Sequence, residues 1–338
     1  MNQLLQLIRK KNQKSKYLKY CIEMKIIIKR YYHFLCNIIR GIYYVICLPF
    51  VFLFIKNYKR KTKYYFSLCA IFKNEAPYFK EWIEYHRMLG VDHIYLYNNF
   101  STDDYMDILS PYIEEGYVTL TDWPYEMSQI PAYEHCYEHY RNETFWLMFL
   151  DLDEFICPIY KTNIKEWIKP FEKYPSVLMY WLMFGTNGIV KADPNKLVIE
   201  QYTNSWASVR NESKQVLNTS FTPVKMYHHH IWCWVKVFGI QFKVPSINEN
   251  KRFVFYHGKE TCPKNGTIQI NHYWSKSLSE YVKKIDKGDM FDKAHDVIRK
   301  DMSFFYWHEH QNIAENKVIF RFLAELKMRM YGIKMIFK

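Results

Sequence analysis

The sequence predicts an α/β protein with a mainly parallel central sheet flanked by helices. Short apolar segments alternate with longer segments whose apolar residues recur at helical spacing. Gly, Asn, Asp or Pro marks most of the boundaries between them. Polar residues, among them several carboxylates, stand directly after the apolar segments. Strands and helices that alternate so closely favour parallel strands joined by crossover helices.

The first strand and helix are predicted within residues 64–90. Residues 64–72 read YYFSLCAIF, an unbroken apolar run typical of a buried strand. Asn74-Glu-Ala-Pro follows as a turn and helix start, and Gly90 marks the end of the helix. Large side chains recur at helical spacing and predict its buried face: Trp82, Tyr85, His86 and Leu89.

Three further strands and two helices follow in alternation. Residues 93–97 (HIYLY) predict the second strand. The run Ser-Thr-Asp-Asp predicts the cap of a helix over 101–115, and residues 117–121 predict a third strand. A helix over 129–140 leads to the most apolar strand, 145–150 (FWLMFL). These segments complete a repeated strand-helix unit typical of a parallel sheet.

Polar side chains follow each of these strands, and the carboxyl ends of parallel strands meet at one edge, where such sheets bind ligands. Asp151 and Asp153 follow the last strand two residues apart, so both can offer oxygens to one hard divalent cation. Such a cation can bridge a diphosphate. The alternative interpretation of this pair is a solvated strand end. The residues expected at this edge are Lys73, Asn74, Glu75, Asn98, Asn99, Asp122, Asp151, Asp153 and Glu154.

The charge is distributed unevenly along the 338 residues. The formal net charge is +13, but it divides into +14 over residues 1–63, −6 over 64–316 and +5 over 317–338. A hydrophobic content of 49% supports a sizeable core and excludes global disorder. An acidic body with two basic ends is not typical of a nucleic-acid-binding domain. We therefore expect no nucleic-acid partner.

Residues 1–63 predict a basic, apolar membrane-anchoring segment. Within it, residues 41–55 (GIYYVICLPFVFLFI) carry no charge and both flanks are basic. As a helix this run would extend about 22 Å, short of the roughly 30 Å of a hydrocarbon core. Basic flanks on both sides favour an anchor in the membrane plane over a span, although a span stays open. We expect an anionic membrane surface as partner and a catalytic domain on its cytoplasmic face.

Residues 301–338 predict a basic, amphipathic C-terminal helical segment. Over residues 318–337 basic residues alternate with apolar ones. Phe322, Leu326, Met330 and Ile333 fall on one helical stripe. Such a stripe can lie on a membrane surface or pack against the body, and the sequence leaves both alternatives open.

With these pieces the chain resembles glycosyltransferase family 92 and its bacterial relatives, which have the GT-A nucleotide-sugar fold. The resemblance covers about residues 65–290, and together its motifs are specific although no single one is. In the early part it rests on Ala70-Ile-Phe-Lys-Asn-Glu-Ala-Pro, Glu81-Trp-Ile-Glu-Tyr-His, Leu89-Gly-Val-Asp-His-Ile-Tyr-Leu-Tyr-Asn-Asn and Ser101-Thr-Asp. Further along it rests on Phe149-Leu-Asp-Leu-Asp-Glu-Phe, Trp181-Leu-Met-Phe-Gly-Thr-Asn-Gly, Leu197-Val-Ile-Glu and Ile270-Asn-His-Tyr-Trp-Ser-Lys-Ser.

The resemblance implies a GT-A domain over 64–300 and roles for particular residues. Mn²⁺ or Mg²⁺ would be held by Asp151, Asp153 and His272. The nucleotide sugar would contact Lys73, Asn74, Glu75, Asn98 and Asp151, with Lys276 and Lys283 balancing phosphate charge. Trp181, Gly185, Asn187 and Gly188 would shape the sugar or acceptor pocket, where glycine lets a backbone approach a ligand. An inverting transfer needs a general base, for which Glu200 is nominated with Glu154 and Asp122 as rivals.

The predicted function is metal-dependent, inverting transfer of a sugar from a nucleotide diphosphate sugar, with UDP as the expected nucleotide. The acceptor would be a glycan or glycolipid at the membrane, as in surface polysaccharide synthesis. Two other classes stay open. One is a non-catalytic, membrane-tethered protein that binds nucleotide sugar or carbohydrate on the same fold. The other is a metal phosphodiesterase, which would need a second carboxylate and histidine cluster.

Overall fold

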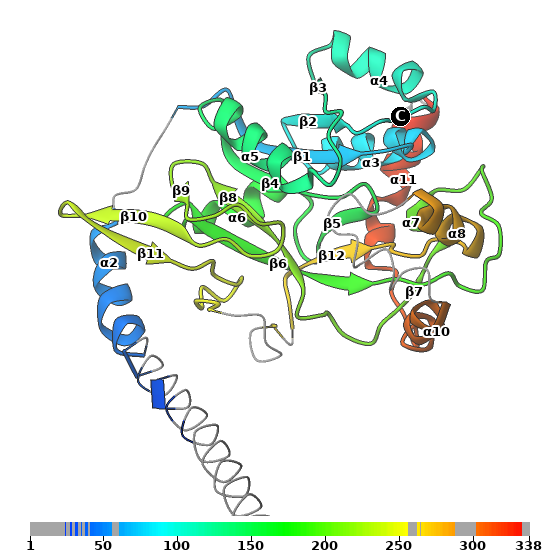
Figure 1. Cartoon of the computed structure of the whole chain (residues 1–338). Helices are drawn as coiled ribbons and strands as arrows, with labels where there is room; N and C mark the ends of the chain where they lie inside the picture. Colours follow the sequence, from blue (N-terminus) through cyan, green and yellow to red (C-terminus); the bar gives the residue numbers. More distant parts are fainter. Residues whose placement is uncertain are drawn as a thin grey trace, which may run out of the picture. The chain divides into compact units, whose positions relative to one another are not determined.

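The computed structural model describes residues 24, 28, 31, 32, 35, 38, 39, 41–55, 61–255, 262, 263, 265–287 and 302–332. The chain divides into two compact units, Met1–Ile55 and Lys56–Lys338. Figure 1 shows the elements of each.

In the first unit, residues 41–55 are helical almost throughout. A π-helical turn, η1 (Tyr43–Cys47), leads into the α-helix α2 (Leu48–Phe54). Pro49 lies in the first turn of α2, where its missing N–H costs no helical hydrogen bond. Among the described residues, no helix is both long enough and apolar enough to cross a membrane.

The second unit is built on a sheet of eight strands in the order β3-β2-β1-β4-β8-β6-β12-β5. The first half of this sheet is parallel, as the sequence predicts. It comprises β1 (Tyr64–Phe72), β2 (His93–Asn98), β3 (Val118–Asp122) and β4 (Thr144–Phe149). All four strand ends therefore point to one edge.

The second half of the sheet is mixed, so the sheet as a whole is mixed but mostly parallel, in line with the prediction. β8 (Ser213–Asn218) runs antiparallel to both of its neighbours, β4 and β6 (Ser176–Met183). β12 (Ile268–His272) is parallel to β6 and antiparallel to β5 (Glu154–Pro158). Antiparallel neighbours need no crossover helix between them, so the strand-helix alternation of the first half does not continue.

Three helices connect the parallel strands: α3 (Ala76–Met88), α4 (Tyr105–Glu114) and α5 (Gln129–Tyr140). The helix predicted from residue 101 begins only at Tyr105. Asp103, expected to cap it, instead accepts a hydrogen bond at 2.8 Å from the backbone N–H of Ala76, at the start of α3. Ser101 accepts from the backbone N–H of Asn74 at 3.0 Å. The two loops at the ends of β1 and β2 are thereby tied together.

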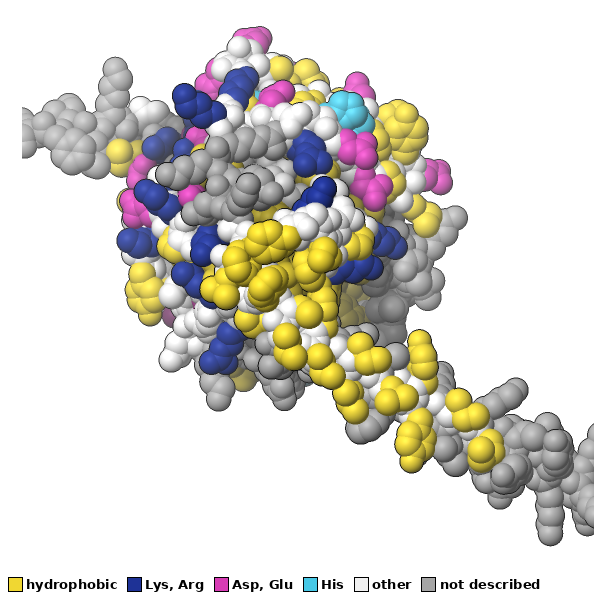
Figure 2. All heavy atoms as spheres, turned by 90° about the vertical axis from the view of Figure 1, so that its left-hand side faces the viewer, with side chains coloured by type: hydrophobic (Ala, Val, Ile, Leu, Met, Phe, Trp, Pro, Cys, Tyr) yellow, Lys and Arg dark blue, Asp and Glu magenta, His cyan; other side chains and the backbone are white. Residues whose placement is uncertain are grey.

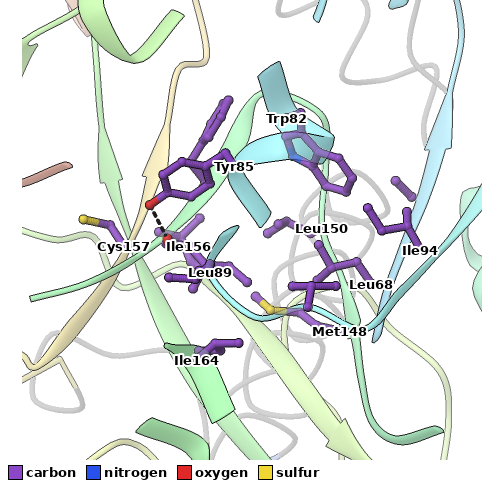
Figure 3. Packing of buried hydrophobic residues seen from close by; sticks show 14 of the residues in the cluster. Leu68, Trp82, Tyr85, Leu89, Ile94, Met148, Leu150, Ile156, Cys157 and Ile164 are labelled. Atoms are coloured by element: carbon purple, nitrogen blue, oxygen red, sulfur yellow. Dashed lines mark hydrogen bonds between the residues drawn. The ribbon is translucent and has the colours of Figure 1, made fainter. Parts of the chain in front are cut away.

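The predicted face of α3 lies in the main core, packed over β5. The Tyr85 hydroxyl donates to the carbonyl of Ile156 at 2.8 Å (Figure 3), and the Trp82 indole donates to the carbonyl of Glu154 at 2.9 Å. Both side chains are fully buried, as are His86 and Leu89. The helix predicted from local spacing thus holds the backbone of the strand that follows Asp153.

The C-terminal segment packs on the body. Its helices are η4 (Val318–Phe322) and α11 (Leu323–Tyr331). Phe322 and Leu326 are buried in the main core, and Met330 packs against it. Of the two alternatives for this stripe, packing on the body is the one observed for these residues, while Ile333 lies outside the described residues.

Shorter elements complete the second unit. A three-stranded sheet, β11-β10-β9, and a two-stranded sheet, β13-β7, flank the central one at different ends (Figure 1). The bounds are α6 (Ile164–Ile168), η2 (Lys169–Phe171), α7 (Val198–Gln201), β7 (Asn204–Ser205), β9 (Thr222–Pro223), β10 (Cys233–Val237), β11 (Ile240–Val244), α8 (Leu278–Lys287), α10 (Met302–His310) and β13 (Ala314–Glu315).

Candidate active site

The ends of the parallel strands converge, as the sequence predicts. In register, Phe72 of β1 stands beside Asn98 of β2, and Asn98 beside Asp122 of β3. The Asn98 amide donates to Asp122 Oδ1 at 3.1 Å. On the other side of β1, the backbone N–H of Leu150 donates to the carbonyl of Cys69 at 3.0 Å. The residues that follow β4 therefore leave the sheet beside those that follow β1.

A tight turn after β4 gathers three carboxylates. The backbone N–H of Glu154 donates to the carbonyl of Asp151 at 3.0 Å, and the backbone N–H of Asp151 donates to Glu154 Oε2 at 3.0 Å. Glu154 is completely buried, and burial raises its pKa well above the ordinary value. The buried carboxylate of Glu154 therefore shapes the turn that presents Asp151 and Asp153.

A buried lysine balances two of these carboxylates. Lys214 of β8 places Nζ 2.7 Å from Asp151 Oδ2 and 3.4 Å from Glu154 Oε2, with 1% of its side chain exposed. Burial opposes its charge, but the two carboxylates outweigh burial and raise the pKa of Lys214. In return, the charge of Lys214 outweighs burial at Asp151 and lowers the pKa of that carboxyl.

Asp153 lies between a second lysine and a histidine. Lys284 of α8 places Nζ 2.6 Å from Asp153 Oδ2, and His272 places Nε2 3.5 Å from Asp153 Oδ1. Burial opposes the charge of Asp153, but Lys284 and, to a smaller extent, the His272 ring outweigh burial and hold the pKa of Asp153 well below its usual range. His272 is brought here by register, because it stands opposite Glu154 in the antiparallel pair of β12 and β5. Burial lowers the pKa of His272.

A third lysine joins this cluster to the loop after β1. Lys276 Nζ lies 3.7 Å from Glu75 Oε2 and 3.3 Å from the centre of the Tyr78 ring. Burial lowers the pKa of Lys276. Trp181 of β6 closes another side, with its ring centre 4.5 Å from that of His272. The edge of the sheet thus carries four carboxylates, Glu75, Asp151, Asp153 and Glu154, paired with three lysines beside an aromatic ring.

Residues 62–319 match the family model of glycosyltransferase family 92. The chain belongs to this family. The match includes every strand of the central sheet and every member of the carboxylate-lysine cluster.

Curated relatives within and beside the family match shorter stretches. A family 92 protein of Oryza sativa subsp. japonica is 27% identical over 203 residues, covering 58% of this chain and 34% of the relative. A family 92 protein of Ricinus communis is 35% identical over 104 residues, covering 30% and 18%. A galactan beta-1,4-galactosyltransferase of Arabidopsis thaliana is 32% identical over 136 residues, covering 36% and 26%. The chain spans about a third or less of the length of these relatives.

Among solved structures, S. aureus TarS residues 1–349 is similar at a TM-score of 0.34 and 10% identity, covering 79% of this chain and 82% of that one. The same protein in complex with UDP-GlcNAc is similar at a TM-score of 0.32 and 11% identity, covering 46% of each chain. This likeness is too distant to support an assignment of fold or substrate.

The family resemblance implies a divalent cation at Asp151, Asp153 and His272, and the geometry allows that to be tested. Carboxylate oxygens such as those of Asp151 and Asp153 suit Mn²⁺ or Mg²⁺. However, ammonium groups already contact both aspartates. In the part of the chain that the structure describes, no three His, Cys, Asp or Glu side chains are placed to hold a metal ion. As arranged, these residues do not form a metal site.

The three nominated bases differ in their surroundings. Glu154 is completely buried. Glu200 of α7 pairs with Lys327 of α11, with Oε1 2.7 Å from Nζ. Asp122 lies at the exposed end of β3 and accepts from Asn98. Asp122 therefore has the most accessible carboxylate of the three, and Glu200 is held by the C-terminal helix.

Several residues expected to contact the nucleotide also build the loops of this edge. Asn74 has a positive φ of 53°, and its Oδ1 accepts from the backbone N–H of Thr102 at 2.7 Å. Asn98 Oδ1 accepts from the backbone N–H of Ser101 at 3.0 Å. These two side chains fix the loops in which Lys73 and Glu75 stand. Whether they also contact a nucleotide stays a prediction.

The segment after β6 has its own structural reasons for its small residues. A Cβ on Gly185 would overlap the side-chain amide of Asn312, so this glycine leaves room for that side chain. Its contact with a sugar or acceptor stays a prediction. Gly188 has a positive φ of 73°, which glycine adopts readily. Asn187 accepts from the backbone N–H of Asn204 at 2.7 Å and donates to the carbonyl of Gln201 at 2.9 Å. The loop after β6 is therefore held in place by the hydrogen bonds of Asn187.

Sequence reasoning missed Lys214 and Lys284. Lys214 is the second residue of an otherwise uncharged strand, Ser213-Lys-Gln-Val-Leu-Asn, and a lone lysine there is the signal of a buried ion pair. Lys284 gives no such signal in the sequence, because it stands next to Lys283, the lysine to which phosphate contact is assigned above. Lys283 is instead 71% exposed and pairs with Glu280 at 2.8 Å.

Proposed function

We propose that this family 92 chain is a glycosyltransferase that moves a sugar from a nucleotide diphosphate sugar to a glycan acceptor. The observation that carries the proposal is the cluster of carboxylates and lysines at the carboxyl edge of the parallel strands, inside the matched family region. Ligands of open α/β sheets bind at this edge. Lys276 and Lys284 are the cations available there to a diphosphate.

The chemistry follows from where the charges lie. As the bond from the sugar to the diphosphate breaks, negative charge grows on the leaving phosphate. Lys276 and Lys284, held in place by Glu75 and Asp153, can stabilise that charge without moving far. The fixed partners keep both ammonium groups oriented before the donor arrives. Trp181 lies beside His272 as an apolar wall for a sugar face.

The finer features of the proposal rest on sequence and relatives. We propose a UDP-linked hexose as donor, because the family resemblance implies UDP and one relative is named a galactan galactosyltransferase. We propose an inverting displacement, with Asp122 as the first carboxylate to test as base because it is accessible. Manganese dependence stays a prediction of the Asp151 and Asp153 spacing, and no step above passes through a metal.

We also propose that transfer takes place at the cytoplasmic face of a membrane. The support is the net charge of +14 over residues 1–63 and the uncharged run 41–55. Anionic lipids attract such basic segments. Ile42, Ile46 and Leu53 are exposed on the helical part of this run. Lipid-linked acceptors would then reach the enzyme by diffusion within the plane of the membrane.

The test is nucleotide release by the purified full chain from a panel of UDP-glucose, UDP-galactose, UDP-N-acetylglucosamine and GDP-mannose, with Mn²⁺ or with EDTA. We expect release from one of the UDP sugars, and loss of release in Asp153→Ala. Binding of a donor without turnover would favour the non-catalytic alternative. Undiminished turnover by Asp153→Ala would refute a role for Asp153, and equal rates with Mn²⁺ and EDTA would refute metal dependence.

A further inference from the structure

The β10–β11 hairpin carries apolar and basic side chains that the proposed chemistry does not use. Val237 pairs with Ile240, so the turn consists of Phe238 and Gly239. Both have positive φ, 48° and 84°. Two-residue turns of this kind favour Asn-Gly or Asp-Gly. A phenylalanine here is conformationally unfavourable, and an outlier of this kind directs attention to function.

The tip of the hairpin is apolar and faces solvent. Ile240 is 61% exposed and Phe238 is 74% exposed. Single exposed apolar residues are common on protein surfaces, but Phe238 and Ile240 together form a small exposed apolar patch at one turn. Basic residues stand behind it: Lys236 on β10 and Lys243 on β11 are both exposed. Lys243 Nζ lies 5.0 Å from the centre of the Trp234 ring.

The stretch of chain that contains the hairpin carries charge of one sign. No Asp or Glu occurs between Glu212 and Glu249, although the second unit as a whole is rich in both. Besides the buried Lys214, this stretch holds Lys225, Lys236 and Lys243, and all three are exposed. Figure 2 looks onto the side of the molecule on which the hairpin lies, and shows Lys and Arg side chains there, with Asp and Glu side chains toward the edges of the view. Apolar side chains with basic residues behind them are typical of membrane-surface contacts.

The hairpin is also tied to the candidate active site. Gln215, next to Lys214 in β8, donates from its side-chain amide to the carbonyl of Tyr227 at 2.6 Å. The ring of His229 lies 4.9 Å from that of Trp181, edge to face. The segment between β9 and β10 is therefore held against both the strand that carries Lys214 and the aromatic wall of the site.

We propose that the β10–β11 hairpin docks on an anionic lipid surface, with Phe238 and Ile240 entering the boundary between headgroups and acyl chains. Lys225, Lys236 and Lys243 would then lie among the lipid phosphates. Because the hairpin is tied to β8, docking would set the height and tilt of the active site above the membrane. This inference extends the membrane part of the proposed function and points to lipid-linked acceptors.

The experiment places an environment-sensitive fluorophore at the tip of the full-length protein through Ile240→Cys. The matched control is Ile313→Cys, which replaces another exposed isoleucine, 79% exposed, next to β13. In Figure 1 the β13-β7 pair lies at the opposite end of the second unit from the hairpin. Wild-type protein treated with the same dye corrects for its native cysteines. Vesicles of phosphatidylcholine, with and without phosphatidylglycerol, are the probe surfaces.

We expect vesicles with phosphatidylglycerol to shift the emission at position 240 to the blue and expose it to quenching by doxyl lipids, with no change at position 313. If the emission at position 240 does not change although the chain still co-sediments with vesicles, the hairpin contact is overturned but the membrane proposal is not. A chain that does not co-sediment overturns both. Shielding at 240 before vesicles are added assigns the tip to another segment or a second copy and overturns the inference.

A second pair of variants tests the charges. Lys236→Glu with Lys243→Glu should weaken binding to these vesicles about tenfold or more, because each basic residue near an anionic leaflet contributes. Lys161→Glu with Lys169→Glu makes the same charge change on exposed lysines outside the hairpin and should weaken it less. Nucleotide release from a soluble donor should be unchanged in both. If both double variants weaken vesicle binding equally, the effect depends on net charge alone, and the proposed role of the hairpin is overturned.

Discussion

Lys283 and Lys284 stand next to each other on α8 but have different partners. Lys284 contacts Asp153, whereas Lys283 is exposed and pairs with Glu280. Lys284→Ala should therefore slow nucleotide release from the donor by about 10²-fold, the usual scale for losing a placed charge in an active site. Lys283→Ala should change the rate by about twofold or less, since exposed ion pairs contribute little.

Steady-state nucleotide release from the UDP sugar that the panel identifies is the measurement. Circular dichroism of both variants would check that they fold. A Lys284→Ala variant as active as Lys283→Ala would contradict the assignment of Lys284 to the diphosphate. A variant that gains activity with Mn²⁺ would show instead that Lys284 competes with a cation at Asp153.

Lys214 is the residue on which the stability of the cluster most depends. Removing it as Lys214→Met would leave Asp151 and the fully buried Glu154 without their shared countercharge. Breaking a buried ion pair on one side costs about 3–5 kcal/mol. We expect a loss of that size in the free energy of unfolding, measured with urea at neutral pH.

Lys283→Met is the control for this prediction, because it removes the same number of charges from an exposed site. Its expected cost is below about 1 kcal/mol. Similar unfolding midpoints for the two variants would contradict the buried pairing of Lys214. A partly restored midpoint in Lys214→Met with Glu154→Gln would support it, since one of the two uncompensated carboxylates is then removed.

At the scale of elements, α3 and α7 are joined by one carboxylate. Glu81 of α3 is 5% exposed and accepts hydrogen bonds from the backbone N–H groups of Val198 and Ile199, at 2.7 and 3.1 Å. These are orphan donors at the start of α7. Burial raises the pKa of Glu81 to about 7, partly offset by these bonds and by the charge of Lys276.

This linkage predicts a pH dependence of stability with a definite sign. Since the pKa of Glu81 rises from 4.5 unfolded to about 7 folded, the folded state holds this proton more tightly. Its contribution to stability is full below about pH 4.5 and is lost as pH rises through 7. The loss is at most about 3 kcal/mol at 1.36 kcal/mol per pKa unit.

Glu81→Gln should remove this part of the pH dependence while keeping an acceptor for α7. Urea unfolding of wild type and variant at pH 5 and pH 7.5 measures the difference. We expect the wild type to lose stability relative to the variant between these two pH values. An unchanged difference would contradict the raised pKa, whatever the absolute stabilities.

At the scale of the whole molecule, the basic N-terminal segment and the second unit are separate compact bodies. Deleting residues 1–60 removes most of the +14 charge while keeping Thr62, whose hydroxyl donates to the carbonyl of Tyr64 at 2.8 Å. We expect the truncated protein to become largely soluble in a membrane fractionation. Its remaining vesicle binding, through the hairpin, should weaken as salt screens the lysines.

Sedimentation of the truncated protein with membranes as completely as the full chain would contradict an anchoring role for residues 1–60. Retained thermal unfolding in one cooperative step is the control for folding. Retained donor hydrolysis would place the catalytic machinery wholly in the second unit.

Much of the first half of the fold was predictable from sequence, because it depends on neighbours along the chain. The strand 64–72 and the helix 129–140 are found as predicted, since an apolar run and helical spacing are local signals. The helix predicted from residue 101 starts late because Asp103 caps α3 instead, 27 residues earlier in the chain. The residue type of a polar side chain in a loop indicates that it can cap a helix, but it does not indicate which of two helices it will cap.

By itself, the sequence determined the order of the strands and helices up to β4, the carboxylates at the ends of these strands and the division of charge into basic ends and an acidic body. Those properties are carried by adjacent residues. Only the tertiary structure decided that β8 lies between β4 and β6, which brings Lys214 to Asp151 across 63 residues. It also decided that His272 stands opposite Glu154 and that Lys284 rather than Lys283 meets Asp153. Pairings of this range depend on strand register, and register is set by packing of the whole sheet rather than by any local pattern.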